Sequence, residues 1–205
     1  MLNKLGRGWN RLCRRIINPR LGQKLRNQDI TLLSANCNGA LILHDLGLKF
    51  NSPFVNLYLT PADFIKYLQR IEYYRHQELH FIRTDKPYPV AQLEDIRIHF
   101  MHYADAQEAR TKWQQRSARM NLTAPFIMMT DRDGCSYADL KAFDQLPFEN
   151  KVVFTHQNYP EFNAAFYIKG FEQQGQVGDL FEFCGLTGKK YYDKFDYVAW
   201  FNGCK

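Results

Sequence analysis

Residues 30–39 read ITLLSANCNG, and this stretch decides the fold class. The apolar run 30–34 is typical of a buried strand, and the polar residues 35–39 indicate a turn into a helix that ends near Leu46. The same alternation continues, with strands expected at 54–59, 79–82, 96–101, 126–129, 152–154 and 164–168, and helices at 60–71, 105–121 and 137–145. It predicts a three-layer α/β domain with a mainly parallel sheet, or a mixed one.

The first 28 residues carry the positive charge of the chain. They hold eight of the 27 basic residues and no acidic one, which leaves 19 basic against 21 acidic residues beyond them. A nucleic-acid-binding protein spreads its basic patch over the fold itself, so no nucleic-acid partner is expected. Residues 2–17 place apolar side chains at spacings of three and four with cations between them, and Asn18-Pro19 predicts the end of this helix. We expect a basic amphipathic helix over 1–18, a linker over 19–28 and a single α/β domain over 29–205.

Two interpretations of the amphipathic helix are open. Either it lies on an anionic membrane surface through residues 1–17, or it packs on the domain with its cations in solvent. Five scattered cysteines without a CxxC pair indicate a reducing compartment. No apolar run reaches the roughly 18 residues that a membrane span needs. We therefore expect a cytoplasmic protein, with peripheral attachment to the inner face of the cytoplasmic membrane as the second option.

Cys37 is the candidate nucleophile. It lies in the turn after the first strand, where α/β sheets bind ligands, and a thiol at a helix N-terminus is favoured as thiolate. His102, at the end of another expected strand, is the candidate base, Asp131 the orienting carboxylate, and Asn36 and Asn38 candidate substrate- or phosphate-binding residues. The opposing interpretation makes Cys37 a small buried residue. The other candidate bases are His44 and His99.

Asp131 and Asp133 offer a second chemistry. Two carboxylates separated by one residue at a strand end can share Mg²⁺ or Mn²⁺, which in turn holds the diphosphate of a nucleotide sugar. The same segment is also an ordinary strand-to-helix turn, in which Asp133 or Ser136 caps the next helix, and this second interpretation is favoured.

A stripe of cations is expected on the helix over 105–121. Lys112, Arg116 and Arg119 fall within an arc of one helical face, where they can hold phosphate groups. The other interpretation is a solvated face with Trp113 turned into the core.

Short motifs follow one another in a fixed order along the chain. They are SANCNG at 34–39, LGL at 46–48, NSPF at 51–54, IHFMHY at 98–103, EA at 108–109, KW at 112–113 followed by Arg116, Arg119 and Asn121, DRDGC at 131–135, FDQLPF at 143–148, and NK at 150–151 running to FT at 154–155. As an ordered set over about residues 28–202, they resemble the bacterial family called domain of unknown function 1919, often labelled exopolysaccharide biosynthesis protein. The resemblance implies a link to capsule, exopolysaccharide or lipopolysaccharide synthesis and no particular reaction.

Three functions are consistent with these observations. The leading one is a transferase acting on a saccharide or lipid-linked saccharide precursor, with acyl transfer from acyl-CoA through Cys37 and His102 preferred. The second is metal-dependent glycosyl or phosphosugar transfer at Asp131 and Asp133, for which 205 residues is short. The third is a non-catalytic binding protein of the polysaccharide assembly machinery.

Overall fold

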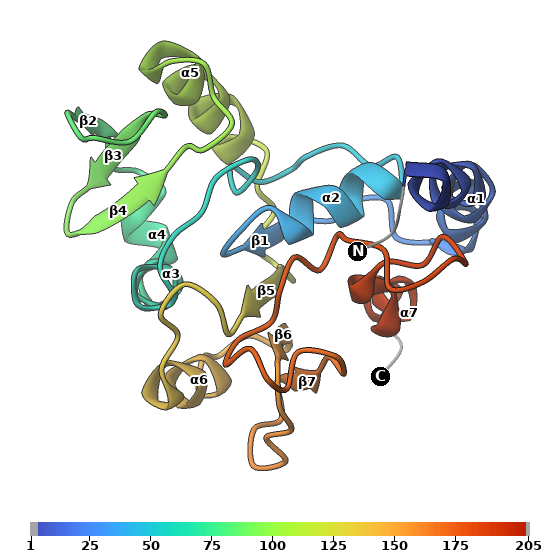
Figure 1. Cartoon of the computed structure of the whole chain (residues 1–205). Helices are drawn as coiled ribbons and strands as arrows, with labels where there is room; N and C mark the ends of the chain where they lie inside the picture. Colours follow the sequence, from blue (N-terminus) through green and yellow to red (C-terminus); the bar gives the residue numbers. More distant parts are fainter. Residues whose placement is uncertain (1–3, 204–205) are drawn as a thin grey trace.

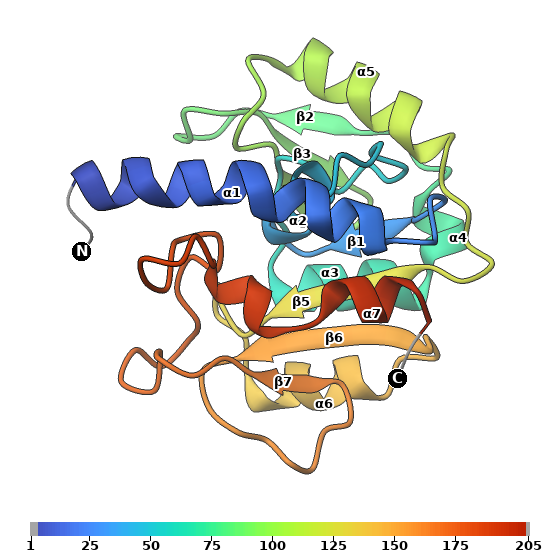
Figure 2. The same cartoon turned by 90° about the vertical axis from the view of Figure 1, so that its right-hand side faces the viewer.

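Four parallel strands form the central sheet of the computed structural model, which describes residues 4–203. In spatial order they are β1 (Leu32–Ser34), β5 (Phe126–Thr130), β6 (Asn150–Thr155) and β7 (Ala165–Tyr167). The register pairs Leu33 with Ile127, and Met128 with Val152. Because all four strands run the same way, their carboxyl ends meet at one edge of the sheet (Figure 2).

Helices cover both faces of this sheet, which confirms the predicted α/β layering. On one face lie α2 (Asn38–Asp45) and α7 (Tyr197–Phe201), and on the other lie α3 (Pro61–Gln69) and α6 (Tyr137–Asp144) (Figure 1). Successive strand residues point to opposite faces, so each strand feeds two separate cores. Leu33 belongs to the cluster with α3 and α6, whereas its neighbour Leu32 belongs to the cluster with α2 and α7.

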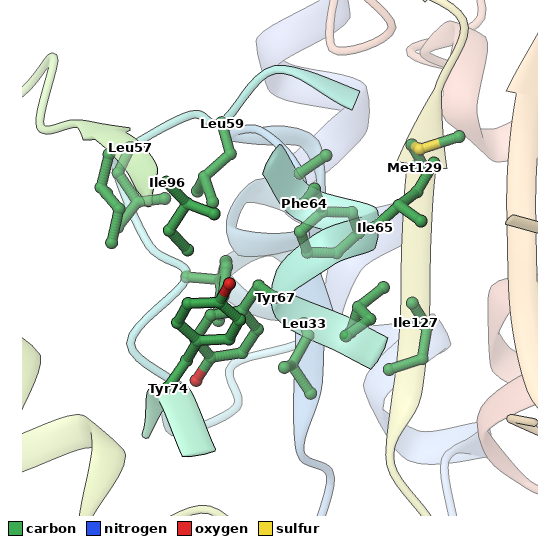
Figure 3. Packing of buried hydrophobic residues seen from close by; sticks show 14 of the residues in the cluster. Leu33, Leu57, Leu59, Phe64, Ile65, Tyr67, Tyr74, Ile96, Ile127 and Met129 are labelled. Carbon is green, nitrogen blue, oxygen red and sulfur yellow. The ribbon is translucent and has the colours of Figure 1, made fainter. Parts of the chain in front are cut away.

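The core under α3 shows why this layer holds together. Figure 3 places Phe64 and Ile65 of α3 against Ile127 and Met129 of β5, and all four side chains are buried. The helix begins where the sequence predicts, because the Thr60 side chain accepts a hydrogen bond from the Asp63 N–H. Burying one such apolar side chain contributes about 1.5–3 kcal/mol to the free energy of unfolding.

A smaller antiparallel sheet lies beside the first. It pairs β2 (His80–Ile82), β3 (Val90–Leu93) and β4 (Ile96–His99), and is accompanied by α4 (Ile71–Tyr74) and α5 (Ala106–Ser117). The strand expected at 54–59 is wrong, because this segment makes only the isolated bridge between Tyr58 and His99. Asn56, with a φ of 59°, breaks its extended course.

The N-terminal helix α1 (Lys4–Lys24) is longer than predicted and does not end at Asn18-Pro19. Proline within a helix removes one N–H donor, but the following turn packs Leu21 and Leu25 against the core. The side chain of Asn202, just after α7, donates to the Lys24 carbonyl and secures the helix end. Residues 19–24 are therefore helix, not linker. Leu2, the first apolar residue of the expected amphipathic stripe, and Cys204, the last of the five cysteines, lie outside the described residues.

No helix within residues 4–203 is both long enough and apolar enough to cross a membrane. The C-terminal segment 195–201 contains α7, which is preceded by the 3-10 helix η1 (Tyr191–Lys194). Residues 170–190 form a long connection before η1, and we call this segment the C-terminal loop.

Candidate functional site

An aspartate and a histidine meet at the carboxyl edge of the parallel sheet. Asp131 directly follows β5, and His156 directly follows the neighbouring strand β6. The Asp131 Oδ2 atom lies 2.5 Å from His156 Nδ1 and accepts the His156 backbone N–H at 2.7 Å. Parallel pairing fixes this meeting, because it brings the last residues of β5 and β6 side by side.

The hydrogen bonds of this pair set the tautomer of the imidazole. Asp131 is an acceptor when ionised, so Nδ1 carries the proton and donates it to Oδ2. The lone pair is then on Nε2, for which the described part of the chain offers no hydrogen-bond partner. The His156 side chain is 13% exposed, against 4% for Asp131. A carboxylate that orients a histidine in this way leaves the second nitrogen free to take a proton from a substrate.

Amide and hydroxyl groups from β1 and β5 lie along the same edge. Asn36 Nδ2 donates to the Thr130 hydroxyl at 2.8 Å, and Asn36 Oδ1 accepts from the backbone and side-chain N–H groups of Asn38. Asn38 is only 4% exposed, yet its Oδ1 atom has no partner among the described residues. These contacts place the two predicted asparagines in one network at the start of α2.

The C-terminal loop packs across the β5 end of the edge. The Val177 N–H donates to Asp131 Oδ1 at 2.8 Å, and Gln176 accepts from the Asp133 N–H. Arg132 and Asp179 form an ion pair at 2.5 Å on the outside of the same turn. The Asp131 carboxylate therefore holds three structural parts together: its own strand end, the end of β6 and the loop.

Cys37 does not have the surroundings of an activated thiol. Its Sγ atom is directed at the Leu57 carbonyl, 3.8 Å away, and burial raises the pKa of the thiol despite a small lowering by its own backbone N–H. His102 is exposed after β4 in the smaller sheet, and its backbone N–H donates to the Asn56 carbonyl.

No hydrogen bond within residues 4–203 joins Cys37 to His102, and Asp131 orients His156 instead. The structure therefore does not show the predicted pairing of Cys37 with His102, and the histidine that is hydrogen-bonded to Asp131 is His156, which follows the adjacent parallel strand. Of the other candidate bases, His44 has an exposed side chain, and His99 stacks on Tyr58 with its ring centroid 4.4 Å away.

Asp131 and Asp133 do not form a pair of carboxylates that are both available to bind a metal ion. Both oxygens of Asp131 already accept N–H groups, whereas Asp133 is exposed with a φ of 59°. Within residues 4–203, no cluster of three His, Cys, Asp or Glu side chains has metal-binding geometry. The helix-cap interpretation holds through Ser136, which accepts the Asp139 N–H while Asp139 accepts the Ser136 N–H.

Two of the three predicted phosphate-binding cations, Arg116 in α5 and Arg119 just after it, have structural partners. Arg116 donates to the Tyr103 hydroxyl at 2.7 Å, and Arg119 donates through Nε and Nη2 to the Phe50 carbonyl. Trp113 is buried, as the structural interpretation of this helix predicts. Lys112 is half-buried on the same helix, which lies beside the smaller sheet (Figure 1). The predicted phosphate role of Arg116 and Arg119 is not supported, since their guanidinium groups hold the 50–55 segment and Tyr103 in place.

Sequence reasoning overlooked His156. The available signal was its position directly after an apolar strand, the same signal that singled out Asp131. What the sequence did not provide was the strand order, which makes β6 the neighbour of β5.

Comparison with known proteins finds a family and a relative that share nearly the whole chain. The family described as "Domain of unknown function (DUF1919)" matches residues 9–202. A protein of Haemophilus influenzae named "Uncharacterized protein" is 60% identical over 199 residues, covering 97% of each chain. The family match extends into α1, so the N-terminal helix is part of the shared region, and the earlier resemblance is confirmed at the level of the family.

Proposed function

The chain belongs to the domain of unknown function 1919 family, and we propose that it is a transferase acting on a cell-surface saccharide precursor, with His156 as general base. One observation carries this proposal: a buried carboxylate orients a histidine whose Nε2 atom has no hydrogen-bond partner within residues 4–203, at the edge where α/β enzymes bind their ligands. The saccharide acceptor rests on the resemblance to proteins labelled exopolysaccharide biosynthesis, not on the geometry.

The proposed step is direct acyl transfer to a hydroxyl group. His156 Nε2 takes the proton of the acceptor hydroxyl as its oxygen attacks the thioester carbon of an acyl-CoA donor. The carbon–sulfur bond then breaks, and the departing thiolate takes up the proton from the imidazolium. The ionised Asp131 stabilises the transient positive charge on His156. General base catalysis of this kind contributes about 10²–10⁴-fold to a rate.

One feature favours acyl over metal-dependent glycosyl transfer. The Asp131 carboxylate accepts three N–H groups, so it serves His156 and the loop in place of a cation. Cys37 is not required, because the hydroxyl attacks the thioester without a covalent enzyme intermediate. We place the reaction at the inner face of the cytoplasmic membrane, where a basic N-terminal helix can reach anionic lipid.

The test compares two histidine variants. His156→Asn keeps an N–H donor for Asp131 but removes the basic Nε2 atom, whereas His102→Asn is the matched control at an exposed histidine. With radiolabelled acyl-CoA and purified cell-surface saccharide as probes, we expect His156→Asn to lose about 10²-fold or more of the transfer rate and His102→Asn to retain it. Equal transfer by both variants contradicts a role of His156 as base.

A non-catalytic binding protein is the second candidate. It is favoured by the two backbone N–H groups bound to Asp131, since a carboxylate that ties a loop to two strands also serves a purely structural purpose. Saccharide binding by the wild type, unchanged in His156→Asn and without transfer from any acyl-CoA, supports this second function.

A further inference from the structure

Polar side chains hold α1 on the domain. Asn10 is fully buried, where its Nδ2 donates to the Gly185 carbonyl at 2.7 Å and its Oδ1 accepts the Gly188 N–H at 2.9 Å. One helical turn later, Arg14 is buried between Asp45 at 2.5 Å and Asp193 at 2.6 Å. The close approach of the C-terminal loop requires glycine at 188, because a Cβ there would lie 2.5 Å from Cys13 Cβ at a φ of +76°.

Four apolar side chains of α1 lie on the opposite, exposed side of the helix, whereas Leu21 near its end packs on the core. Leu5, Trp9, Leu12 and Ile16 follow one another at helical spacing and are 84%, 56%, 50% and 54% exposed. Leu186 of the C-terminal loop, 58% exposed, extends the row because its carbonyl accepts the Trp9 indole N–H. We call these five residues the outer face of α1. An amphipathic helix on a globular domain normally turns such a stripe inward, so this outer face is suited to an apolar partner outside the chain.

The charge around the outer face identifies that partner. Arg11, Arg15 and Arg20 are exposed along α1, and residues 1–28 contain no acidic side chain. A bilayer with anionic headgroups meets both requirements at once, since its acyl boundary takes the apolar stripe and its headgroups attract the flanking cations. A second copy of the chain that docked through the same face would instead place its own row of arginines opposite this one, and the like charges would repel.

We infer that the outer face of α1 binds an anionic bilayer surface, with the helix lying in the plane of the interface. The residues that dock α1 and those that face the lipid are different, so the domain can stay folded while bound. In Figure 2, the arrows of β5 and β6 point to the same end of the molecule as the N-terminal half of α1. The C-terminal loop contacts both sites, through Val177 at Asp131 and Gly185 at Asn10.

This inference deepens the proposed function by naming the surface from which the site takes its acceptor, a lipid-linked saccharide. Lipid binding does not depend on the chemistry at His156. A transfer assay and a binding assay therefore fail separately: loss of lipid binding leaves the transferase proposal in place, and absence of transfer leaves the membrane inference in place.

The experiment is co-sedimentation of the full chain with vesicles of phosphatidylglycerol or of phosphatidylcholine. We expect strong binding to the anionic vesicles, release as salt rises, and at least about tenfold weaker binding to neutral vesicles. Leu12→Gln with Ile16→Gln should reduce binding about tenfold or more, because two apolar side chains then leave the acyl boundary. The double variant Arg15→Gln with Arg20→Gln should reduce binding to the anionic vesicles about fivefold for each positive charge removed.

Matched controls carry the same changes far from α1. Met101→Gln after β4 and Lys141→Gln on α6 replace an exposed apolar residue and an exposed cation, and should bind vesicles as the wild type does. The melting temperature of each variant shows whether its fold is kept. The inference is overturned if the Leu12/Ile16 double variant binds anionic vesicles as strongly as the wild type does. It is also overturned if the wild type forms a concentration-dependent dimer that this variant abolishes.

Discussion

This protein has two buried ionic clusters, and they differ in whether the partner of the buried carboxylate can accept a proton. At the α1 interface, Asp45 accepts hydrogen bonds from Arg14, Lys190, Tyr192 and Asn18. Burial raises the pKa of Asp45, but the hydrogen bonds of Tyr192 and Lys190 and the charges of Lys190 and Arg14 lower it by more, so its pKa lies below the ordinary aspartate value. At the sheet edge, the Asp131 side chain is 4% exposed, against 8% for Asp45, but its partner His156 keeps one nitrogen without a partner among the described residues.

The difference separates a structural cluster from a reactive one. Where the carboxylate's partner is an arginine, the cluster holds two parts of the chain together and cannot take a proton from a substrate, because a guanidinium stays protonated in proteins. Where a buried carboxylate fixes a histidine but leaves its Nε2 atom free, the same type of ion pair can move a proton. Burial of charge alone therefore does not mark an active site.

The largest expected effect comes from breaking the α1 cluster. Arg14→Ala leaves Asp45 and Asp193 buried without their shared cation, and removing one partner of a buried ion pair costs about 3–5 kcal/mol of the free energy of unfolding. Urea denaturation measures this loss. Arg15→Ala, at the exposed neighbour, is the control and should stay within about 0.5 kcal/mol of the wild type. A similar stability for both variants would mean that α1 does not depend on the Arg14 cluster.

A medium effect is expected at the sheet edge. Asp131→Asn turns an N–H donor towards at least one of the three groups that now donate to Asp131, which costs about 1–3 kcal/mol of the free energy of unfolding. His156→Asn retains a donor for Asp131 and should cost less than about 1 kcal/mol. The same denaturation experiment measures both. If His156→Asn is the more destabilising of the two, His156 contributes to the fold more than to a reaction.

The smallest effect concerns Cys37, and it sharpens the boundary of the reactive region. Burial raises the pKa of this thiol, so little thiolate is present at neutral pH. Iodoacetamide should therefore modify Cys37 at least about tenfold more slowly than the exposed Cys184, as measured by mass spectrometry of the native protein. Cys37→Ser should leave acyl transfer unchanged. Faster modification of Cys37 than of Cys184 would restore the thiol as the candidate nucleophile.

Much of the site was open to prediction from the sequence, but its grouping was not. Asn36, Asn38 and Asp131 were identified because each follows an apolar strand, and the structure brings all three to the carboxyl edge of one sheet. His102 was chosen by the same rule, but it follows β4, a strand of the smaller sheet. Local patterns show where a strand ends, but they contain no information on which strands are neighbours.

The sequence by itself determined the α/β class, the helix starts at Thr60, Asp105 and Ser136, and the concentration of positive charge before Asp29. These properties depend on residues close together in the chain, through apolar periodicity and capping hydrogen bonds. The tertiary structure alone decided that His156 is the partner of Asp131, and that α1 docks through Asn10 and Arg14 with its apolar stripe outward. The physical reason is that strand order and the docking of a helix are set by contacts between residues far apart in sequence.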